Sequence, residues 1–220
     1  MERRKAIKNL GLSFGAMVAT PAAVSLLESC SGPTTETWIP TYYSNAQGVM
    51  LRKVIDRILP AVDDLPSATE VNVHVFIDKF MAEVMALDQR EQMTVAFDTC
   101  SAALLEKADT DDHERVTGEV IDAFLSENLA LSKEDKEAID GRIGAAFGQG
   151  LQMADLETEL QVHLALDALR GISIWAYRTN EFVGKNVLAY DPVPGENIGC
   201  GDLQELTGGR DWSEGTYLVL

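Results

Sequence analysis

The segment ADLETELQVHLALDALRGISIWAYR, residues 154–178, decides the fold class of this chain. Its apolar residues recur every three or four positions, which predicts one long α-helix. They form two stripes: Leu156, Leu160, Leu164 and Ile172 on one side, and Val162, Leu166, Leu169 and Ile174 on the other. Because a helix that is apolar on two sides must be covered on both, we expect it to be central in the domain or covered by a partner protein.

Upstream of this helix, five segments show the same helical period, and no segment shows the alternation of a β-strand. The first helix is expected to stop at Pro60, because proline cannot continue a helix. The third is expected to begin at Asp88 with Glu91 in a capping box, and the fifth at Ser132 with Asp135 as its cap partner. The expected buried residues are Leu51, Val54, Ile55, Ile58 and Leu59; Val73, Phe76, Ile77, Phe80, Met81 and Val84; Met93, Ala96, Phe97, Cys100, Ala103 and Leu104; Val116, Val120, Ile121, Phe124 and Leu125; and Ile139, Ile143 and Phe147. The chain is thus predicted to be all-α, a single orthogonal or irregular bundle of about six helices.

The helical domain is expected to span residues 47–187, and the chain changes character after it. Residues 188–220 contain Pro192, Pro194 and several glycines without an apolar period, apart from a weak strand signal in the final TYLVL. We therefore expect a long irregular C-terminal arm without helix or sheet of its own, packed on the domain or on a partner. Aromatic residues gather around the end of the long helix and this arm. These residues are Trp175, Tyr177, Tyr190 and Trp212. Together with the two prolines they form the predicted partner interface, and the alternative is that the aromatic residues plug the core under the arm.

The first 29 residues read as an export signal. Arg3, Arg4 and Lys8 lie in RRKAIK, which resembles the twin-arginine signal that sends folded proteins across a membrane. The uncharged stretch that follows is too short and broken to span a membrane. Leu27–Cys30 resembles a bacterial lipobox, so Cys30 is expected to carry a lipid anchor, followed by a polar tether over residues 30–46. The alternative is an uncleaved or ordinary signal with a chance cysteine.

Charge and motifs exclude several classes of function. The formal net charge of −17 would repel nucleic acid and anionic lipid. The three histidines show no metal-ligand spacing, and no nucleotide-binding, haem-attachment or nucleophile motif occurs, so we expect no catalytic residue, metal or cofactor in this chain. One polar stripe of the long helix contains His163, Asp167 and Arg170. His163 and Asp167 could act as a general base, or, more simply, Asp167 and Arg170 form an ion pair.

Two cysteines remain besides Cys30. Cys100 lies on an apolar stripe, which favours a buried thiol, whereas Cys200 lies in a Gly-Cys-Gly turn. A disulfide between Cys100 and Cys200 is allowed, but their spacing does not fix it.

Three features together resemble the gluconate 2-dehydrogenase subunit 3 family in its lipoprotein form: the twin-arginine leader, RKVIDRILPA at 52–61, and VLAYDPVPGENIGCGDL at 187–203. The resemblance implies a small noncatalytic subunit beside an FAD-dependent catalytic subunit of the glucose-methanol-choline type, which oxidises a sugar or sugar derivative and passes electrons to a cytochrome c. It further implies a location on the periplasmic side of a bacterial membrane, where the small subunit supports export, folding or anchoring of its partner. The alternative is a free-standing envelope lipoprotein that binds a ligand or a protein without a dehydrogenase partner.

Overall fold

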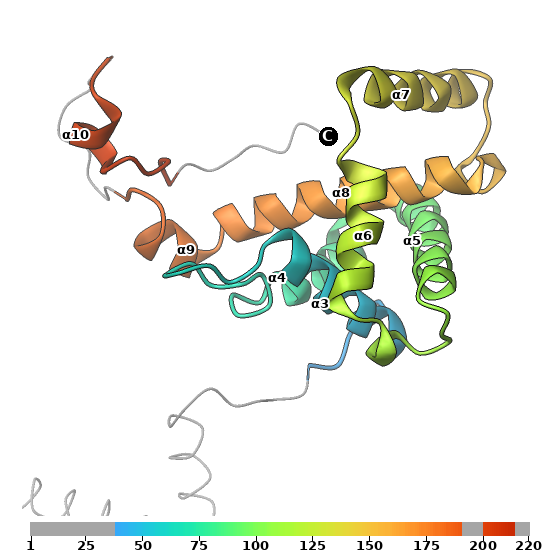
Figure 1. Ribbon diagram of the computed structural model, residues 1–220, viewed down its shortest axis with the longest axis horizontal. Helices are drawn as coiled ribbons and strands as arrows, with labels where there is room; N and C mark the ends of the chain where they lie inside the picture. The colour runs from blue at the N-terminus through green and yellow to red at the C-terminus, as the bar shows by residue number, and fades with distance from the viewer. Residues whose placement is uncertain (1–37, 191–199, 214–220) are drawn as a thin grey trace, which may run out of the picture. The chain divides into compact units, whose positions relative to one another are not determined.

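The computed structural model describes residues 38–190 and 200–213, and its elements belong to the unit Ile39–Leu220. Within these residues the structure contains eight α-helices and no β-strand, which confirms the predicted all-α class (Figure 1). The α-helices are α3 (Asn45–Ile58), α4 (Val73–Lys79), α5 (Leu87–Lys107), α6 (Gly118–Leu129), α7 (Lys133–Gly148), α8 (Thr158–Arg178), α9 (Glu181–Asn186) and α10 (Leu203–Thr207). The short π and 3-10 segments are η1 (Phe80–Val84), η2 (His113–Arg115) and η3 (Met153–Asp155). None of the described helices is long and apolar enough to cross a membrane.

The long helix α8 occupies the centre of the domain, as the two apolar stripes predict. It packs against α3, α4, α5, α6 and α9 (Figure 1). Both stripes contribute buried side chains: Leu160 from one, and Leu166 and Leu169 from the other. The neighbouring elements cover the C-terminal half of α8 incompletely, and Ile174 there is 40% exposed. This part of α8 borders the candidate site described below.

Side-chain caps explain where some of the helices begin. Ser44 and Gln47 form a capping box at the start of α3, and the Ser132 hydroxyl accepts from the Asp135 N–H at 3.1 Å, which confirms the predicted start of α7. The predicted start of α5 at Asp88 is wrong. Its N-cap is Ala86 without a side-chain cap, because the extended backbone after η1 lets the helix begin at Leu87. Asp88 lies in the first turn, where a negative charge favours the helix dipole.

The second predicted helix is divided by a change of helical pitch. The α-helix α4 gives way to the π-helical segment η1, in which the Met85 N–H donates to the Phe80 carbonyl at 3.0 Å. A wider turn rotates the following residues away from the buried stripe. Val84 is consequently 66% exposed, although it was predicted to be buried. Phe76, which precedes η1 in α4, is 37% exposed, also contrary to prediction. Phe147 at the end of α7 is likewise 39% exposed, contrary to prediction.

The described part of the C-terminal arm is more ordered than the sequence indicates. It contains the short helix α10, capped by the Asp202 side chain, so the prediction of an arm without a helix is wrong. An isolated bridge pairs Ala189 with Trp212, where the Ala189 N–H donates to the Asp211 carbonyl and the Ser213 N–H to the Ala189 carbonyl, both at 2.9 Å. Arg178 at the end of α8 donates to Asp211 at 2.6 Å. The possible strand in TYLVL lies outside the described residues.

Candidate partner-binding site

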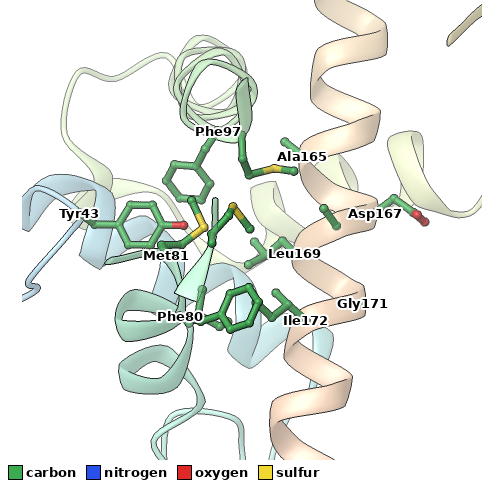
Figure 2. Close-up of a pocket in the computed structure, with 13 residues that line it drawn as sticks. Tyr43, Phe80, Met81, Phe97, Ala165, Asp167, Leu169, Gly171 and Ile172 are labelled. Carbon is green, nitrogen blue, oxygen red and sulfur yellow. The ribbon is translucent and has the colours of Figure 1, made fainter. Parts of the chain in front are cut away.

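An apolar pocket opens between η1, α5 and α8, and we refer to it as the methionine pocket (Figure 2). Its volume is about 330 Å³. Met81, Met85 and Met93 supply flexible thioether side chains that can adapt to different apolar shapes. The remaining lining residues are Tyr43, Ile77, Phe80, Phe97, Ala165, Asp167, Ala168, Leu169, Gly171 and Ile172.

Two of these lining residues carry polar side-chain groups, Tyr43 and Asp167. Tyr43 is 7% exposed, and burial raises the pKa of its phenol, so it remains neutral at physiological pH. Asp167 pairs with Arg170 on the same helix, and Figure 2 shows its carboxylate pointing away from the pocket. The pocket therefore offers a surface for apolar groups and no reactive side chain aimed into it.

Three aromatic rings form a cluster beside the pocket, which we call the aromatic triad: Phe76, Phe80 and Trp175. The Trp175 ring meets Phe76 edge-on at 5.0 Å between centroids and Phe80 at 5.9 Å. Phe76 and Phe80 stack at 6.0 Å. Such pairs stabilise one another by about 0.5–1.5 kcal/mol beyond burial. Because Phe80 belongs to both groups, the triad and the methionine pocket form one continuous apolar surface.

Further apolar side chains extend this surface. Val84 and Leu87, on either side of Met85 and Ala86 in sequence, are each 66% exposed. Large contiguous apolar areas on the surface of soluble proteins usually mark interaction sites. The geometry therefore indicates a binding surface for another molecule.

The predicted interface residues fall into separate places. Trp175 lies in the triad, whereas the Tyr177 hydroxyl donates to the Pro66 carbonyl at 2.8 Å and so holds the loop before α4. Tyr190 and Trp212 lie on the arm and are 49% and 40% exposed. Pro192 and Pro194 lie outside the described residues. Sequence reasoning missed Phe76 and Phe80 as site residues, because their helical spacing is that of an ordinary buried stripe.

The polar stripe of α8 contains an ion pair. Arg170 donates to Asp167, as the simpler interpretation predicted. His163 Nδ1 instead meets the backbone carbonyl of Asn128 in α6 at 2.9 Å. The imidazole therefore links two helices and is not polarised by the carboxylate.

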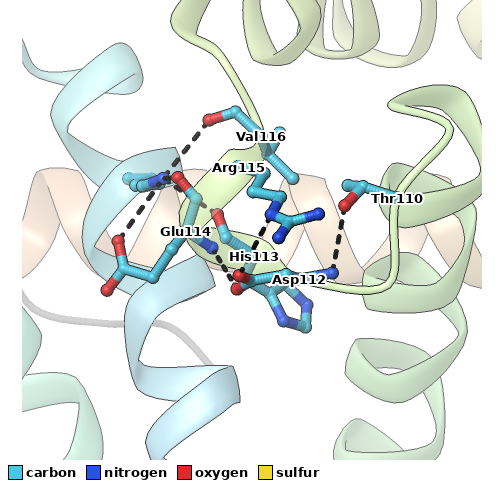
Figure 3. Close-up of polar contacts among 7 residues, drawn as sticks. Thr110, Asp112, His113, Glu114, Arg115 and Val116 are labelled. Atoms are coloured by element: carbon cyan, nitrogen blue, oxygen red, sulfur yellow. Dashed lines mark hydrogen bonds and ion pairs between the residues drawn. The ribbon is translucent and has the colours of Figure 1, made fainter.

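A second polar cluster joins α3 to the loop before α6 (Figure 3). The Lys53 ammonium donates to the backbone carbonyls of His113, Glu114 and Val116 at 2.9, 2.6 and 3.3 Å. The Asp112 carboxylate accepts from the Glu114 N–H at 2.9 Å and starts η2. These bonds fix the path of a loop that would otherwise leave several carbonyls unpaired.

His113 of this cluster also forms a buried pair with Ser101. Ser101 and His113 are 7% and 8% exposed, with 2.7 Å between Oγ and Nε2. Burial lowers the pKa of His113 below its usual value, so the ring is held neutral. A substrate has no access to a hydroxyl buried to this degree, and the pair is a packing and hydrogen-bonding contact between α5 and η2.

The described residues contain no group of three His, Cys, Asp or Glu side chains that could hold a metal ion. Cys100 is a buried free thiol whose pKa is raised to about 12 by burial, and Cys200 is an exposed free thiol. Cys30 and the signal residues Arg3, Arg4 and Lys8 lie outside the described part of the chain.

Comparison with known proteins places the chain in a family. Residues 45–195 match the model of the family described as gluconate 2-dehydrogenase subunit 3. No curated protein and no solved structure matches the chain significantly. The matched region contains the aromatic triad and every lining residue of the methionine pocket except Tyr43, and it extends over more than half of the sequence. The chain therefore belongs to the gluconate 2-dehydrogenase subunit 3 family.

Proposed function

We propose that this chain is the noncatalytic small subunit of a periplasmic, membrane-anchored dehydrogenase. Its partner is an FAD-dependent catalytic subunit of the glucose-methanol-choline type that oxidises a sugar or sugar derivative, with a cytochrome c as electron acceptor. Family membership supports the role of a dehydrogenase subunit. The observation that carries the proposal is the continuous apolar surface of the methionine pocket and the aromatic triad, since such a surface is suited to a protein partner.

The environments of the reactive side chains support a noncatalytic role. Cys100 and the Ser101–His113 pair are buried, and His163 is tied to a backbone carbonyl. A nucleophile or base must reach its substrate within hydrogen-bond distance. These groups do not meet that requirement, so the chemistry is assigned to the partner.

Export explains why a noncatalytic subunit would carry the signal. The twin-arginine export system recognises a pair of arginines, here Arg3 and Arg4, and transports proteins that have already folded. A catalytic subunit that has bound FAD in the cytoplasm could then cross together with this chain. The lipid on Cys30 would hold the complex at the membrane.

Coexpression with the flavoprotein subunit from the same source tests the proposal. We expect the two chains to co-purify with flavin absorbance and dye-linked sugar oxidation, while this chain alone shows neither. The double variant Arg3→Lys, Arg4→Lys should leave both chains in the cytoplasm. Flavin bound to the isolated chain, or a flavoprotein that never co-purifies with it, would overturn the proposal.

A free-standing ligand-binding lipoprotein is the second candidate, and the methionine pocket is the observation that favours it. Its volume of about 330 Å³ lies at the lower end of the range for small-molecule sites. Such sites orient their ligand with a few convergent polar groups, however, and here the Tyr43 hydroxyl stands without a second one, because Asp167 faces away and is ion-paired. Native mass spectrometry of the purified protein separates the two candidates, because a resident small molecule would add a discrete mass.

A further inference from the structure

We propose that the methionine pocket binds a small, neutral and largely apolar carbonyl compound, and that its carbonyl oxygen accepts a hydrogen bond from the Tyr43 hydroxyl. Such a site belongs to this chain alone and goes beyond the proposed function. The sugar that the partner subunit would oxidise is a different class of molecule, because its many hydroxyl groups would find no hydrogen-bond partners among apolar walls.

The Tyr43 hydroxyl is aimed into the pocket. Tyr43 is 7% exposed, and Figure 2 shows its hydroxyl pointing toward the centre of the pocket. In the described part of the chain this hydroxyl takes part in no hydrogen bond, whereas the Tyr43 backbone N–H donates to Asp78. Tyrosine hydroxyls usually have a hydrogen-bond partner when they are buried. A molecule that enters the pocket is therefore placed to be that partner.

The ring of Tyr43 is held in position by its neighbours. It packs against Phe97 with 4.9 Å between ring centroids, and the backbone N–H donates to the buried Asp78 carboxylate at 3.1 Å. A donor that is already oriented loses little conformational freedom when a ligand binds, which favours affinity. The position of the hydroxyl thus determines where the oxygen of the ligand lies.

The electrostatic surroundings favour a neutral hydrogen-bond acceptor. Burial raises the pKa of Tyr43, and the nearby Asp78 and Asp98 carboxylates raise it further, so the hydroxyl keeps its proton and can donate it. The same carboxylates would repel an anion beside the hydroxyl. A ligand with a hydroxyl or amine would add a second proton without an acceptor, because Asp167 faces away from the pocket. A carbonyl oxygen is neutral, accepts a hydrogen bond and adds no donor.

The volume and the walls of the pocket indicate the rest of the ligand. A water molecule occupies about 30 Å³ in the liquid, so a pocket of about 330 Å³ has room for at least about ten non-hydrogen atoms. Met81, Met85 and Met93 adapt to irregular apolar shapes and make favourable contacts with aromatic rings. A ring or a short chain beside the carbonyl therefore suits the pocket. Held by one hydrogen bond, such a small ligand exchanges with solvent, unlike a ligand that stays bound through purification.

The first measurement locates the ligand by NMR of the full-length purified protein with ¹³C-methyl-labelled methionine. Met81, Met85 and Met93 line the pocket, whereas Met50 and Met153 are buried outside it. The probe is acetophenone, which carries one neutral carbonyl beside a ring. We expect acetophenone to shift the methyl signals of the three pocket methionines and to leave those of Met50 and Met153 in place. Shifts that spare the pocket methionines, or no shifts at all, would overturn the inference.

The second measurement isolates the contribution of the Tyr43 hydroxyl. Isopropylbenzene replaces the carbonyl of acetophenone by an apolar group of the same shape, and benzoate adds a negative charge. In the same titration we expect Tyr43→Phe to bind acetophenone about 5-fold more weakly than the wild type, and both proteins to bind isopropylbenzene within about 2-fold of each other. Benzoate should bind the wild type at least about 10-fold more weakly than acetophenone does.

Tyr42→Phe is the matched control for this titration, because Tyr42 is the neighbouring tyrosine and does not line the pocket. It should bind acetophenone like the wild type. Equal acetophenone binding by the wild type and Tyr43→Phe would overturn the inference, and so would benzoate that binds as tightly as acetophenone.

Thermal melts of the same variants without ligand test whether the Tyr43 hydroxyl has a partner inside the protein. Tyr42→Phe removes the hydrogen bond between the Tyr42 hydroxyl and Thr94 and should melt at a lower temperature than the wild type. Tyr43→Phe removes no such bond and should melt at the same temperature as the wild type or above it. A fall for Tyr43→Phe as large as the fall for Tyr42→Phe would overturn the inference.

Two other occupants of the pocket would be recognised in the same spectra. If the flavoprotein subunit abolishes the acetophenone shifts of the pocket methionines, the partner fills the pocket. If these signals move when the protein alone is diluted, a second copy fills it. Either result would overturn the assignment to a small molecule. The proposed function would still stand, because co-purification with the flavoprotein subunit requires no small ligand in this chain.

Discussion

A buried carboxylate, Asp78, fixes the segment that leads into the domain. Asp78 on α4 is 1% exposed, and its oxygens accept from the backbone N–H groups of Thr41, Tyr42 and Tyr43 at 2.6, 2.9 and 3.1 Å. A charge in such a place is stable only when donors surround it. Tyr43 is thereby held where it lines the methionine pocket, so one carboxylate contributes to the shape of the site.

Replacing this acceptor is expected to destabilise the domain. Asp78→Ala leaves three N–H donors without their partner, and we expect the free energy of unfolding to fall by about 3 kcal/mol. Urea denaturation measures the loss. Asp140→Ala, at an exposed aspartate of α7, is the control and should change stability by less than about 0.5 kcal/mol. Equal effects of the two substitutions would show that the Asp78 bonds contribute nothing net.

His74, also on α4, makes the fold sensitive to acid. Burial, reinforced by nearby Arg52, lowers the pKa of His74 to about 4 from 6.5. The unfolded chain therefore takes up this proton near pH 6.5 and the folded protein only near pH 4, so stability falls as the pH drops through this window. In His74→Gln we expect this loss to be smaller by about 1 kcal/mol, reduced from full linkage by solvent screening. Thermal melts at pH 7, 5.5 and 4.5 test this, and parallel pH profiles of the two proteins would contradict it.

At the scale of elements, the local sequence predicts the presence of the helices better than it predicts their boundaries. The spacing of Leu51, Val54 and Ile55 and the hydroxyl of Ser132 act within one turn, so they predict α3 and α7 correctly. The π-helical turn of η1 depends on packing against other elements, and an apolar stripe at helical spacing carries no sign of it. The spacing of an apolar stripe likewise does not say how far neighbouring elements cover each residue, so Phe76 was predicted to be buried although it is 37% exposed.

The C-terminal arm is expected to be dispensable for folding. The last buried hydrophobic side chain among the described residues is Val183. The Arg178–Asp211 pair joins the arm to the domain, whereas the bridge between Ala189 and Trp212 lies within the arm. A chain that ends after Tyr190 should therefore keep its helical circular dichroism and a melting temperature within about 5 °C of the full chain. A larger drop would identify the arm as part of the structural core.

The same arm is expected to matter for association. Exposed aromatic residues are frequent interface anchors, and truncating a well-buried one typically costs about 2 kcal/mol in binding. Trp212→Ala or Tyr190→Ala should therefore weaken binding of the catalytic subunit by roughly 30-fold, with unchanged helical content. Surface plasmon resonance on the two variants measures this, and unchanged affinity would place the contact wholly on the methionine pocket and the triad.

At the scale of the whole molecule, the candidate site was only partly predictable. Trp175 could be proposed from sequence because aromatic residues cluster near it. Its triad partners Phe76 and Phe80 could not, because they are about a hundred positions away and meet it only through the packing of α4 on α8. The methionine pocket likewise draws its lining from α4, η1, α5, α8 and the segment before α3. Contacts of this kind arise from tertiary packing, which no local pattern encodes.

Attachment of the whole molecule to a membrane is expected to depend on one thiol. Acylation requires the sulfur of Cys30, so Cys30→Ser should move the protein from the membrane fraction to the soluble fraction or leave an unprocessed precursor. Labelling with a fatty-acid analogue checks this, and Cys200→Ser serves as the control because that exposed thiol lies outside the lipobox. Equal labelling of the wild type and Cys30→Ser would refute the anchor.

The three N–H···O bonds to Asp78 also determine how the domain responds to mechanical force. A pull along the chain from the N-terminal side acts on these bonds at Thr41–Tyr43 before it reaches α3. Rupture of these bonds, together with the Tyr42–Thr94 hydrogen bond and the Tyr43–Phe97 ring contact, would release about 10 Å of chain, at roughly 3.3–3.6 Å per residue, while the helical core stays intact. Because forced rupture is governed by rate, a brief load can be absorbed at this point and the bonds can re-form after it. Tyr43 leaves the wall of the methionine pocket in the same event, so tension on the chain would alter the shape of the partner-binding surface.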